Sequence, residues 1–265
     1  MTHVRSLSLS RSAARRDFRA RSLAWFDAHA RDLPWRRTLD PYAIWVSEIM
    51  LQQTRVAAVI DRYSAFLARF PTISTLAAAT EAEVLTLWSG LGYYRRARMM
   101  HRAARVVVDQ HAELLPSTAA ALTLLPGIGS YTSAAIASIA FSEAVAVVDG
   151  NVNRVVMRLM GWGEDGTPAA AQEARIQQRA TELLDATRPG DFNQAMMELG
   201  ATICLPRAPL CLQCPVFDYC LTRGEHATTP RAAMRSEKIT YALVRREHFK
   251  RGHGRQEQVL LEQRP

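Results

Sequence analysis

Four cysteines, grouped between residues 204 and 220, are the feature of this chain that points most directly to chemistry. They are Cys204, Cys211, Cys214 and Cys220, and the 265-residue sequence contains no others. Four thiolates that converge on one centre can bind zinc or an iron–sulfur cluster. A zinc module usually has two separated Cys-x-x-Cys pairs, and here only one such pair exists. Disulfides would require an oxidising compartment. The residues favour a [4Fe–4S] cluster and leave zinc and disulfides open.

Two carboxylates stand where they could take part in acid catalysis or in stabilising positive charge. Glu48 adjoins apolar residues, among them Trp45 and Ile49. Burial among such neighbours would raise its pKa and make it a proton donor, whereas an ordinary helical glutamate is a solvated charge. Asp149 follows an apolar segment and precedes an expected helix. It could cap that helix or act in chemistry, and the sequence allows both roles.

A glycine turn, Gly127-Ile128-Gly129, lies between two amphipathic segments. Glycine lets the backbone approach a ligand closely, and the free N–H groups at the start of the next helix can bind phosphate. Many helical hairpins use such a turn only for packing. Because Pro126 ends the first segment and polar residues open the second, within a basic protein, we favour contact with a DNA backbone.

The charge of the chain also favours a polyanionic partner. The net charge is +8 at pH 7 and the isoelectric point is about 9.8. Only Lys238 and Lys250 are lysines, so residues 1–237 contain none and cannot form a Schiff base through lysine. No apolar run is long enough for a membrane span, and the N-terminus lacks the pattern of a secretory signal.

The elements that must position these residues are mostly helices. Apolar spacing predicts one long helix from about Pro41 to Phe70. Further helices are expected at 80–88, 93–110, 117–125, 130–141, 151–161, 169–187 and 191–203, with prolines at the breaks. Residues 1–15 are expected to be a disordered basic tail. After a polar linker at 224–238, strands are expected at 239–246 and 258–264, as the beginning of a domain that is otherwise missing.

Together these residues resemble the adenine DNA glycosylases of the MutY type, within the helix-hairpin-helix glycosylase superfamily that includes endonuclease III. The likeness runs in collinear order over about residues 20–223 and includes the cysteine loop. It rests on LPWR (33–36), SEIMLQQTRV (47–56), WSGLGYYRRAR (88–98), LPGIGSYTSAAIASIAF (125–141), VDGNVNRV (148–155) and FNQAMMELGATIC (192–204).

The resemblance implies an all-α, two-lobed fold. A six-helix barrel lobe with the helix-hairpin-helix would comprise 38–143. A cluster lobe would comprise 16–37 and 144–223, with a [4Fe–4S] cluster on the four cysteines. Residues 239–265 would then be the start of a truncated Nudix-like domain. Because such a domain recognises 8-oxoguanine in these enzymes, we expect a weakened preference for 8-oxoguanine over guanine opposite adenine.

The reaction implied by the resemblance is hydrolysis of the N-glycosidic bond of adenine mispaired with 8-oxoguanine or guanine, after base flipping. Glu48 would be the acid, and Asp149 would stabilise an oxocarbenium-like sugar. Tyr131 takes the position of the catalytic lysine of endonuclease III-type enzymes, which implies a monofunctional glycosylase. Tyr131 and Asn151 would both support the transition state.

The same resemblance implies a set of DNA contacts. Gln53 and Tyr93 would fill or wedge the base stack, although Tyr93 could instead be core packing. Trp35 and Arg36 would line the adenine side of the site, and the backbone of the glycine turn would meet phosphate. Arg207, in the cysteine loop, would also meet phosphate, unless it is a plain surface arginine.

The expected partner is double-stranded DNA containing an A:8-oxoguanine or A:G mispair, bound by a monomer. We expect a cytoplasmic, nucleoid-associated protein of the bacterial type, with no membrane association. Two rival functions are a lyase-active glycosylase for oxidised pyrimidines and a non-enzymatic iron–sulfur sensor that binds DNA. The sensor would leave the placement of Glu48 and Asp149 unexplained.

Overall fold

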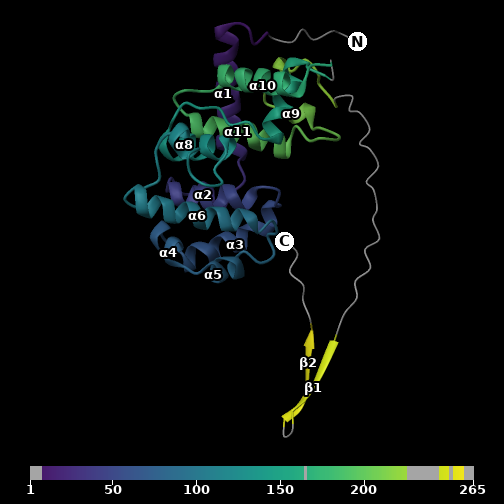
Figure 1. Ribbon diagram of the computed structural model, residues 1–265. Coiled ribbons are helices and arrows are strands. Elements are labelled where there is room, and N and C mark those ends of the chain that lie inside the picture. Colours follow the sequence, from purple (N-terminus) through teal and green to yellow (C-terminus); the bar gives the residue numbers. More distant parts are fainter. Residues whose placement is uncertain (1–7, 164–165, 226–244, 251–252, 260–265) are drawn as a thin grey trace. The chain divides into compact units, whose positions relative to one another are not determined.

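The computed structural model describes residues 8–163, 166–225, 245–250 and 253–259 of the chain. The chain divides into two units, residues 1–227 and 228–265. The first unit is all-α over its described residues, as predicted (Figure 1). No helix in the described part of the chain has the length and apolar content needed to cross a membrane.

The helices of the first unit follow in this order. They are α1 (Ser12–His29), α2 (Pro41–Leu51), α3 (Val56–Arg69), α4 (Ile73–Ala78), α5 (Glu81–Leu87), α6 (Arg95–Gln110), α7 (Ala119–Leu122), α8 (Ser130–Phe141), α9 (Gly150–Met160), α10 (Ala169–Leu183) and α11 (Pro189–Thr202). Three short 3-10 helices, η1 (Pro34–Arg36), η2 (Cys211–Gln213) and η3 (Phe217–Tyr219), complete the unit.

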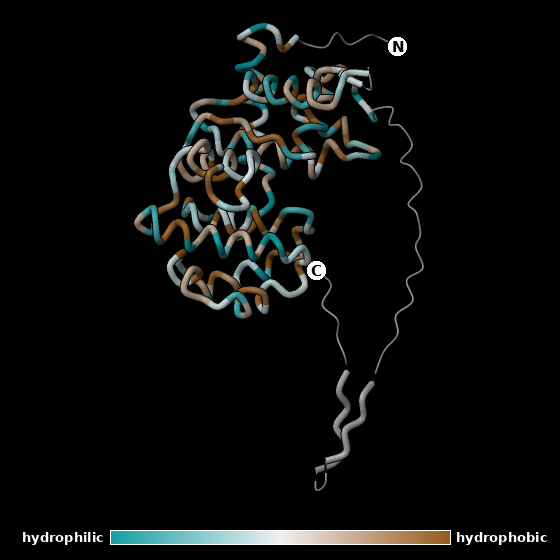
Figure 2. The backbone as a smooth tube through the Cα atoms, in the orientation of Figure 1, coloured by the Kyte–Doolittle hydropathy of each residue, from teal (hydrophilic) through white to brown (hydrophobic). Residues whose placement is uncertain are grey.

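Two large hydrophobic clusters and a small third one fill the interior of this unit. The first includes Trp45 of α2, Phe66 of α3 and Trp88, all fully buried. The second includes Phe18 of α1 and Val156 of α9. Apolar residues recur through the helices of both clusters, where they are brown in Figure 2. The boundaries that we expect for the two lobes stay a prediction.

Two residues near one of these expected boundaries pack with the first hydrophobic cluster. Leu33 and Trp35 fall within 16–37, which we assigned to the cluster lobe, yet both pack into the first hydrophobic cluster. The reason is the short helix η1, which turns both side chains inward; Trp35 packs edge-on against Tyr63 of α3 at a ring-centroid distance of 5.5 Å.

The single helix predicted from Pro41 to Phe70 is wrong, because the chain breaks between α2 and α3. Gln53 lies in this break with a φ of +55°, outside the helical region. The last carbonyl groups of α2 have no partners within the helix. They accept hydrogen bonds from the guanidinium group of Arg96, a residue of α6. Apolar spacing continues through the break, so the pattern alone does not reveal it.

The disordered tail predicted for residues 1–15 is wrong at its C-terminal end. Helix α1 begins at Ser12, so residues 12–15 are helical, and Leu9 is buried. The guanidinium group of Arg15 donates to the carbonyl oxygens of Leu9 and Ser10, which fixes this start. Residues 1–7 lie outside the described residues. Elsewhere, the helix predicted at 117–125 is reduced to α7, which has four residues.

In the second unit, β1 (Arg245–Lys250) and β2 (His253–Val259) form an antiparallel pair with Arg246 opposite Gln258. The predicted strands at 239–246 and 258–264 overlap this pair only at its outer end. The rest of the pairing runs mostly through polar residues, apart from Phe249, because backbone pairing does not need apolar side chains. Residues 239–244 and 260–264, and most of the predicted linker, lie outside the described residues.

Four helices of the first unit bring the candidate site together. Helix α2, which carries Glu48, packs against α8, which begins just before Tyr131. Helix α9, which Asp149 precedes, packs against α11, and α11 also packs against α8. Residues distant in the sequence therefore meet where α2, α8, α9 and α11 approach one another (Figure 1).

Candidate active site

Glu48 is a buried acid with one close polar partner. Its residue exposure is 5%, and its Oε2 atom accepts a 2.7 Å hydrogen bond from the hydroxyl group of Tyr131. Burial raises the pKa of Glu48 to about 7. The Tyr131 hydrogen bond acts against this rise, while the negative charge of Asp149 adds to it. Glu48 can therefore hold or release a proton near neutral pH.

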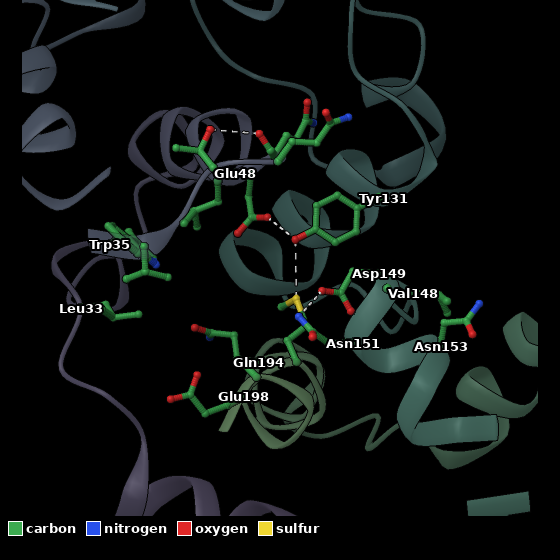
Figure 3. A pocket seen from close by; sticks show the side chains of 18 of the residues that line it. Leu33, Trp35, Glu48, Tyr131, Val148, Asp149, Asn151, Asn153, Gln194 and Glu198 are labelled. Carbon is green, nitrogen blue, oxygen red and sulfur yellow. Dashed lines mark hydrogen bonds between the residues drawn. The ribbon is translucent and has the colours of Figure 1, made fainter. Parts of the chain in front are cut away.

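Asp149 caps a helix and also lines the cavity that contains Glu48. Its Oδ1 atom caps α9 by accepting a 2.7 Å hydrogen bond from the backbone N–H of Val152. Its Oδ2 atom accepts a 3.0 Å hydrogen bond from the side-chain amide of Asn151. The capped carboxylate also faces the same cavity as Glu48 and Tyr131 (Figure 3). Capping thus fixes this carboxylate without removing it from the site.

The cavity shared by these residues is a broad cleft of about 950 Å³. Its walls come from the α2–α3 turn, the start of α8, the start of α9, α10 and α11. Its lining includes the predicted residues Trp35, Arg36, Glu48, Gln53, Tyr131, Asp149 and Asn151. A cleft of this volume can hold a nucleobase with its sugar, since ligand pockets commonly have about 300–1,000 Å³.

Glu198 of α11 forms a second buried carboxylate in this cleft. Its side chain is 1% exposed and is paired with Arg31 at 2.6 Å and with Arg36 at 2.9 Å. Hydrogen bonds from these arginines overcome the effect of burial and lower the pKa of Glu198 to about 2. Glu198 is thus an ionised anchor, in contrast to Glu48. It also holds Arg36 against the wall of the cleft.

The two residues predicted to enter the base stack are both exposed. Gln53 lies at the rim of the cleft in the α2–α3 turn. Tyr93 is 60% exposed, so it is not core packing. Both have left-handed backbone conformations, with φ values of +55° and +47°. Such backbone is unusual for residues other than glycine and often marks functional turns.

The glycine turn forms the predicted hairpin before α8. Gly127 has a φ of +78°, and a Cβ atom there would lie 2.6 Å from Cβ of Met99, so the turn requires glycine at this position. Gly129 is the N-cap of α8 and offers no side-chain cap to the free N–H groups. Ile128 is buried, while Leu124 at the edge of the turn is 85% exposed.

The four cysteines border one small cavity beside the second hydrophobic cluster. All four are free thiols, which argues against the disulfide interpretation. Burial raises the pKa of the Cys214 thiol to about 12, so its thiolate form would need strong cationic stabilisation, such as a metal centre provides. Within the described residues, no three His, Cys, Asp or Glu side chains are grouped closely enough to hold a single metal ion.

Arg158 of α9 organises the loop that carries these cysteines. It is buried, and its guanidinium group donates to the carbonyl oxygens of Leu205 at 2.6 Å and Pro206 at 2.8 Å. It also approaches the sulfur of Cys204 at 3.4 Å. Arg207, in the same loop, is exposed on the surface.

A path of hydrogen bonds joins Asp149 to the cysteine loop. Asn151 donates to Asp149 and accepts a 2.8 Å hydrogen bond from Arg154. Arg154 in turn donates to the carbonyl oxygen of Cys204 at 2.7 Å. Close contact with α11 supports the path, because a Cβ atom at Gly200 would lie 2.6 Å from Cβ of Asn151. The carboxylate is therefore held by α9 and, through two side chains, by the loop.

The structure brings some residues to the site that sequence reasoning missed. Glu198 was not singled out, although it lies within the quoted stretch at 192–204. Met197 was missed too; its sulfur lies 3.6 Å from the Tyr131 hydroxyl oxygen. Gln52 donates a 3.1 Å hydrogen bond to Thr132, which joins the end of α2 to α8. No pattern in the neighbouring sequence marks these residues, because their roles depend on contacts with side chains of other helices.

Comparisons with known proteins point to one family. A family model described as "HhH-GPD superfamily base excision DNA repair protein" matches residues 46–180. Adenine DNA glycosylase of Homo sapiens is 49% identical over 215 residues, covering 78% of this chain and 39% of the human protein. Adenine DNA glycosylase of Mycolicibacterium smegmatis is 43% identical over 203 residues, covering 76% of this chain and 68% of that protein. The chain spans 39% to 44% of the length of the human, rat and mouse relatives.

Solved structures share the fold. A thermostable thymine-DNA glycosylase matches with a TM-score of 0.72 and 31% identity, over 80% of this chain and 97% of that one. Endonuclease III in a non-covalent DNA complex matches with a TM-score of 0.66 and 20% identity, over 78% and 94% of the two chains. At 20% identity, the likeness to endonuclease III shows a shared fold alone.

Proposed function

This chain belongs to the HhH-GPD superfamily of base excision DNA repair proteins and, within it, to the adenine DNA glycosylases, and we propose that it removes adenine mispaired with 8-oxoguanine or guanine in double-stranded DNA. The observation that carries this proposal is the buried Glu48, whose pKa of about 7 suits an acid that must hold a proton at neutral pH. Asp149 faces the same cleft and supplies a negative charge beside it.

The proposed reaction begins after the adenine leaves the base stack and enters the cleft, since its bond is not accessible in the duplex. Glu48 gives its proton to the adenine ring. The bond between the base and C1′ of the sugar breaks, and its electron pair leaves with the neutral adenine. The sugar becomes an oxocarbenium-like cation, which the carboxylate of Asp149 stabilises. Water adds to C1′ and loses a proton, which leaves an abasic site.

Tyr131 and Asn151 hold the two acids in their separate roles. The Tyr131 hydroxyl donates to Glu48, and the Asn151 amide donates to Asp149 (Figure 3). Tyr131 replaces the lysine that lyase-active relatives would use, and residues 1–237 contain no lysine. We therefore propose a monofunctional glycosylase without efficient Schiff-base chemistry.

Contacts with DNA are proposed for residues that line the cleft and for exposed residues elsewhere on the first unit. Gln53 and Tyr93 would enter the stack around the extruded adenine, and Trp35 and Arg36 would line its pocket. The backbone of the glycine turn and Arg207 would meet phosphate groups. The exposure of Tyr93 and Arg207 and the position of Gln53 at the cleft rim support these roles. The contact of Trp35 with Tyr63 limits it to one edge of the cleft.

A [4Fe–4S] cluster on the four cysteines is the cofactor that we propose. The four cysteines fit such a cluster, because four free thiols border one cavity. They are not close enough together to hold a single metal ion. A cluster is wider than an ion and suits this wider spacing. Zinc is the weaker alternative. When bound, such a cluster supplies a cross-link for the loop between α11 and the end of the first unit. It has no step in the base release proposed above.

Assembly and location are finer proposals. We propose that the chain binds DNA as a monomer and acts in a bacterial-type cytoplasm near the nucleoid.

Release of adenine from duplexes with a single defined mispair tests the main proposal. The purified chain is mixed in excess with DNA carrying A:8-oxoguanine, A:G or T:G, and the free base is identified. We expect adenine from the first two duplexes and no thymine from the third. Borohydride trapping on abasic DNA should give no strong covalent adduct. Strong trapping would support the rival lyase function, and DNA binding without base release would support the rival sensor.

A further inference from the structure

Outside the cleft, one arginine joins the α2–α3 turn, which lines the cleft, to the loop before α6. Arg96 lies in the first turn of α6 and is half-buried. Its Nη1 atom donates to the last carbonyl groups of α2 and of the turn that follows. These are the carbonyls of Ile49 at 2.8 Å, Met50 at 3.1 Å and Gln52. Arg96 thus closes the C-terminal end of the helix that carries Glu48.

The other nitrogen of the same group reaches the second turn. The Nη2 atom of Arg96 donates to the Thr54 hydroxyl at 3.0 Å and to the carbonyl oxygens of Leu91 at 3.1 Å and Gly92 at 3.3 Å. Thr54 belongs to the α2–α3 turn, while Leu91 and Gly92 belong to the loop before α6. One guanidinium group therefore bridges two loops that are about forty residues apart.

Each of the bridged turns presents an exposed side chain on left-handed backbone. Gln53 has a φ of +55° and Tyr93 a φ of +47°. Arg96 donates to the carbonyl oxygen just before Gln53 and to that just before Tyr93. Its guanidinium carbon also lies 5.3 Å from the centre of the Tyr93 ring. Left-handed backbone at such residues persists only where the surroundings enforce it.

We propose that Arg96 is a positioning residue that sets Gln53 and Tyr93 as a pair, so that both side chains enter the duplex from fixed places when the target base is extruded. The inference rests on the proposed function, in which these two residues occupy the stack around that base. Arg96 does not line the cleft. Its effect should therefore fall on extrusion of the base and not on cleavage of the bond.

Lysine cannot replace this arrangement. The ammonium group of lysine has one nitrogen as its donor. The planar guanidinium group of arginine has separate nitrogens, which donate hydrogen bonds to separate turns. Arg98, on the same helix, offers a matched control. It is exposed and paired with Glu81 at 2.9 Å, and it touches neither turn. Loss of Arg98 removes the same charge from α6 without releasing either turn.

The test measures extrusion without base release. The full chain carries Glu48→Gln in every sample, which blocks cleavage, and binds a saturating amount of DNA with 2-aminopurine in place of the target adenine. Fluorescence of 2-aminopurine rises when the base leaves the stack. We expect Arg96→Met to lower the extruded fraction about tenfold, as the loss of hydrogen bonds from a charged group implies. Arg98→Met should match the parent chain.

Two further variants cover the case in which Arg96→Met does not fold and test whether Arg96 and Tyr93 act together. Arg96→Lys should fold and still lose most of the extrusion signal, so it replaces Arg96→Met if that chain does not fold. Tyr93→Ala combined with Arg96→Lys should cost little more than Tyr93→Ala alone, because the two residues act together. A full extrusion signal in a folded Arg96 variant, or strictly additive losses, would overturn the proposal.

The result is separable from the proposed function. The fluorescence signal needs no release of adenine. If the wild-type chain releases no adenine but Arg96→Lys loses the signal, the glycosylase proposal fails and the positioning role stands. If the wild-type chain releases adenine and Arg96→Lys extrudes the base fully, only the positioning role fails.

Discussion

The hydroxyl group of Tyr131 lies 2.7 Å from Oε2 of Glu48 and donates its hydrogen bond to that carboxyl group. This contact favours the ionised form of Glu48, whereas burial favours the protonated form. Burial has the larger effect, so the pKa of Glu48 is raised to about 7. The carboxyl group of Glu48 is therefore a proton donor that is protonated below neutral pH and ionised above it.

Tyr131→Phe should raise the pKa of Glu48 further, because it removes a hydrogen bond to the charged form while leaving the ring in place. In the single-turnover rate of adenine release, the fall in rate toward high pH should move up by about one pH unit, since a hydrogen bond to a charged group contributes roughly 1.5 kcal/mol. A shift toward lower pH would contradict this account. The maximal rate should also fall, because Tyr131 supports the site.

Asp149→Asn separates capping from chemistry. Asparagine caps helices as well as aspartate, so the free energy of unfolding should change by less than about 0.5 kcal/mol. Adenine release should nevertheless fall by about 100-fold or more, because the charge that stabilises the sugar cation is lost. Thermal unfolding and single-turnover assays measure the two effects.

Asp149→Ala is the companion variant. This variant should lose both the charge and the helix cap. Loss of the cap should lower the free energy of unfolding by about 1 kcal/mol. If Asp149→Asn kept full activity while Asp149→Ala lost only stability, Asp149 would be a helix cap and nothing more.

The ion pairs of Glu198 predict a pH-dependent contribution to stability. The pKa of Glu198 is lowered from 4.5 to about 2 in the folded chain. A lowered pKa stabilises the fold fully above the ordinary value and loses that effect as the pH falls from about 4.5 toward 2. Glu198→Gln should thus destabilise the fold at pH 7 by about 3 kcal/mol, as breaking a buried pair does, and by much less near pH 2. Urea unfolding at a series of pH values tests this; a constant difference would contradict it.

Cys214→Ser tests the proposed cluster. Iron and sulfide analysis of the purified wild-type chain should give about four of each per chain, and the variant should lose most of both along with thermal stability. Leu212→Ser, at a 96% exposed position in the same loop, is the matched control and should keep its iron. About one zinc per chain, without iron, would contradict the cluster and support the alternative metal.

The four cysteines could be singled out by residue type and spacing alone. The roles of Glu48 and Asp149 followed from the resemblance, because residue type left a solvated glutamate and a helix cap open; the structure places the two acids in one cleft. The break after α2 could not be predicted. The carbonyl groups at this break pair with Arg96, a residue more than forty positions away, and the apolar spacing runs through the break. Glu198 was missed for a similar reason, since its partners Arg31 and Arg36 are distant in the sequence.

The central claim is that Glu48 is the proton donor for adenine release, and the pH dependence of that release tests it most directly. Single-turnover rates on an A:8-oxoguanine duplex should be high at acidic pH and fall as the pH rises through about 7. Glu48→Gln should lower the rate by about 100-fold or more at every pH. Glu173→Gln, an exposed carboxylate in the same cleft, should match the wild type. A Glu48→Gln chain that keeps the wild-type rate and pH profile would contradict the claim.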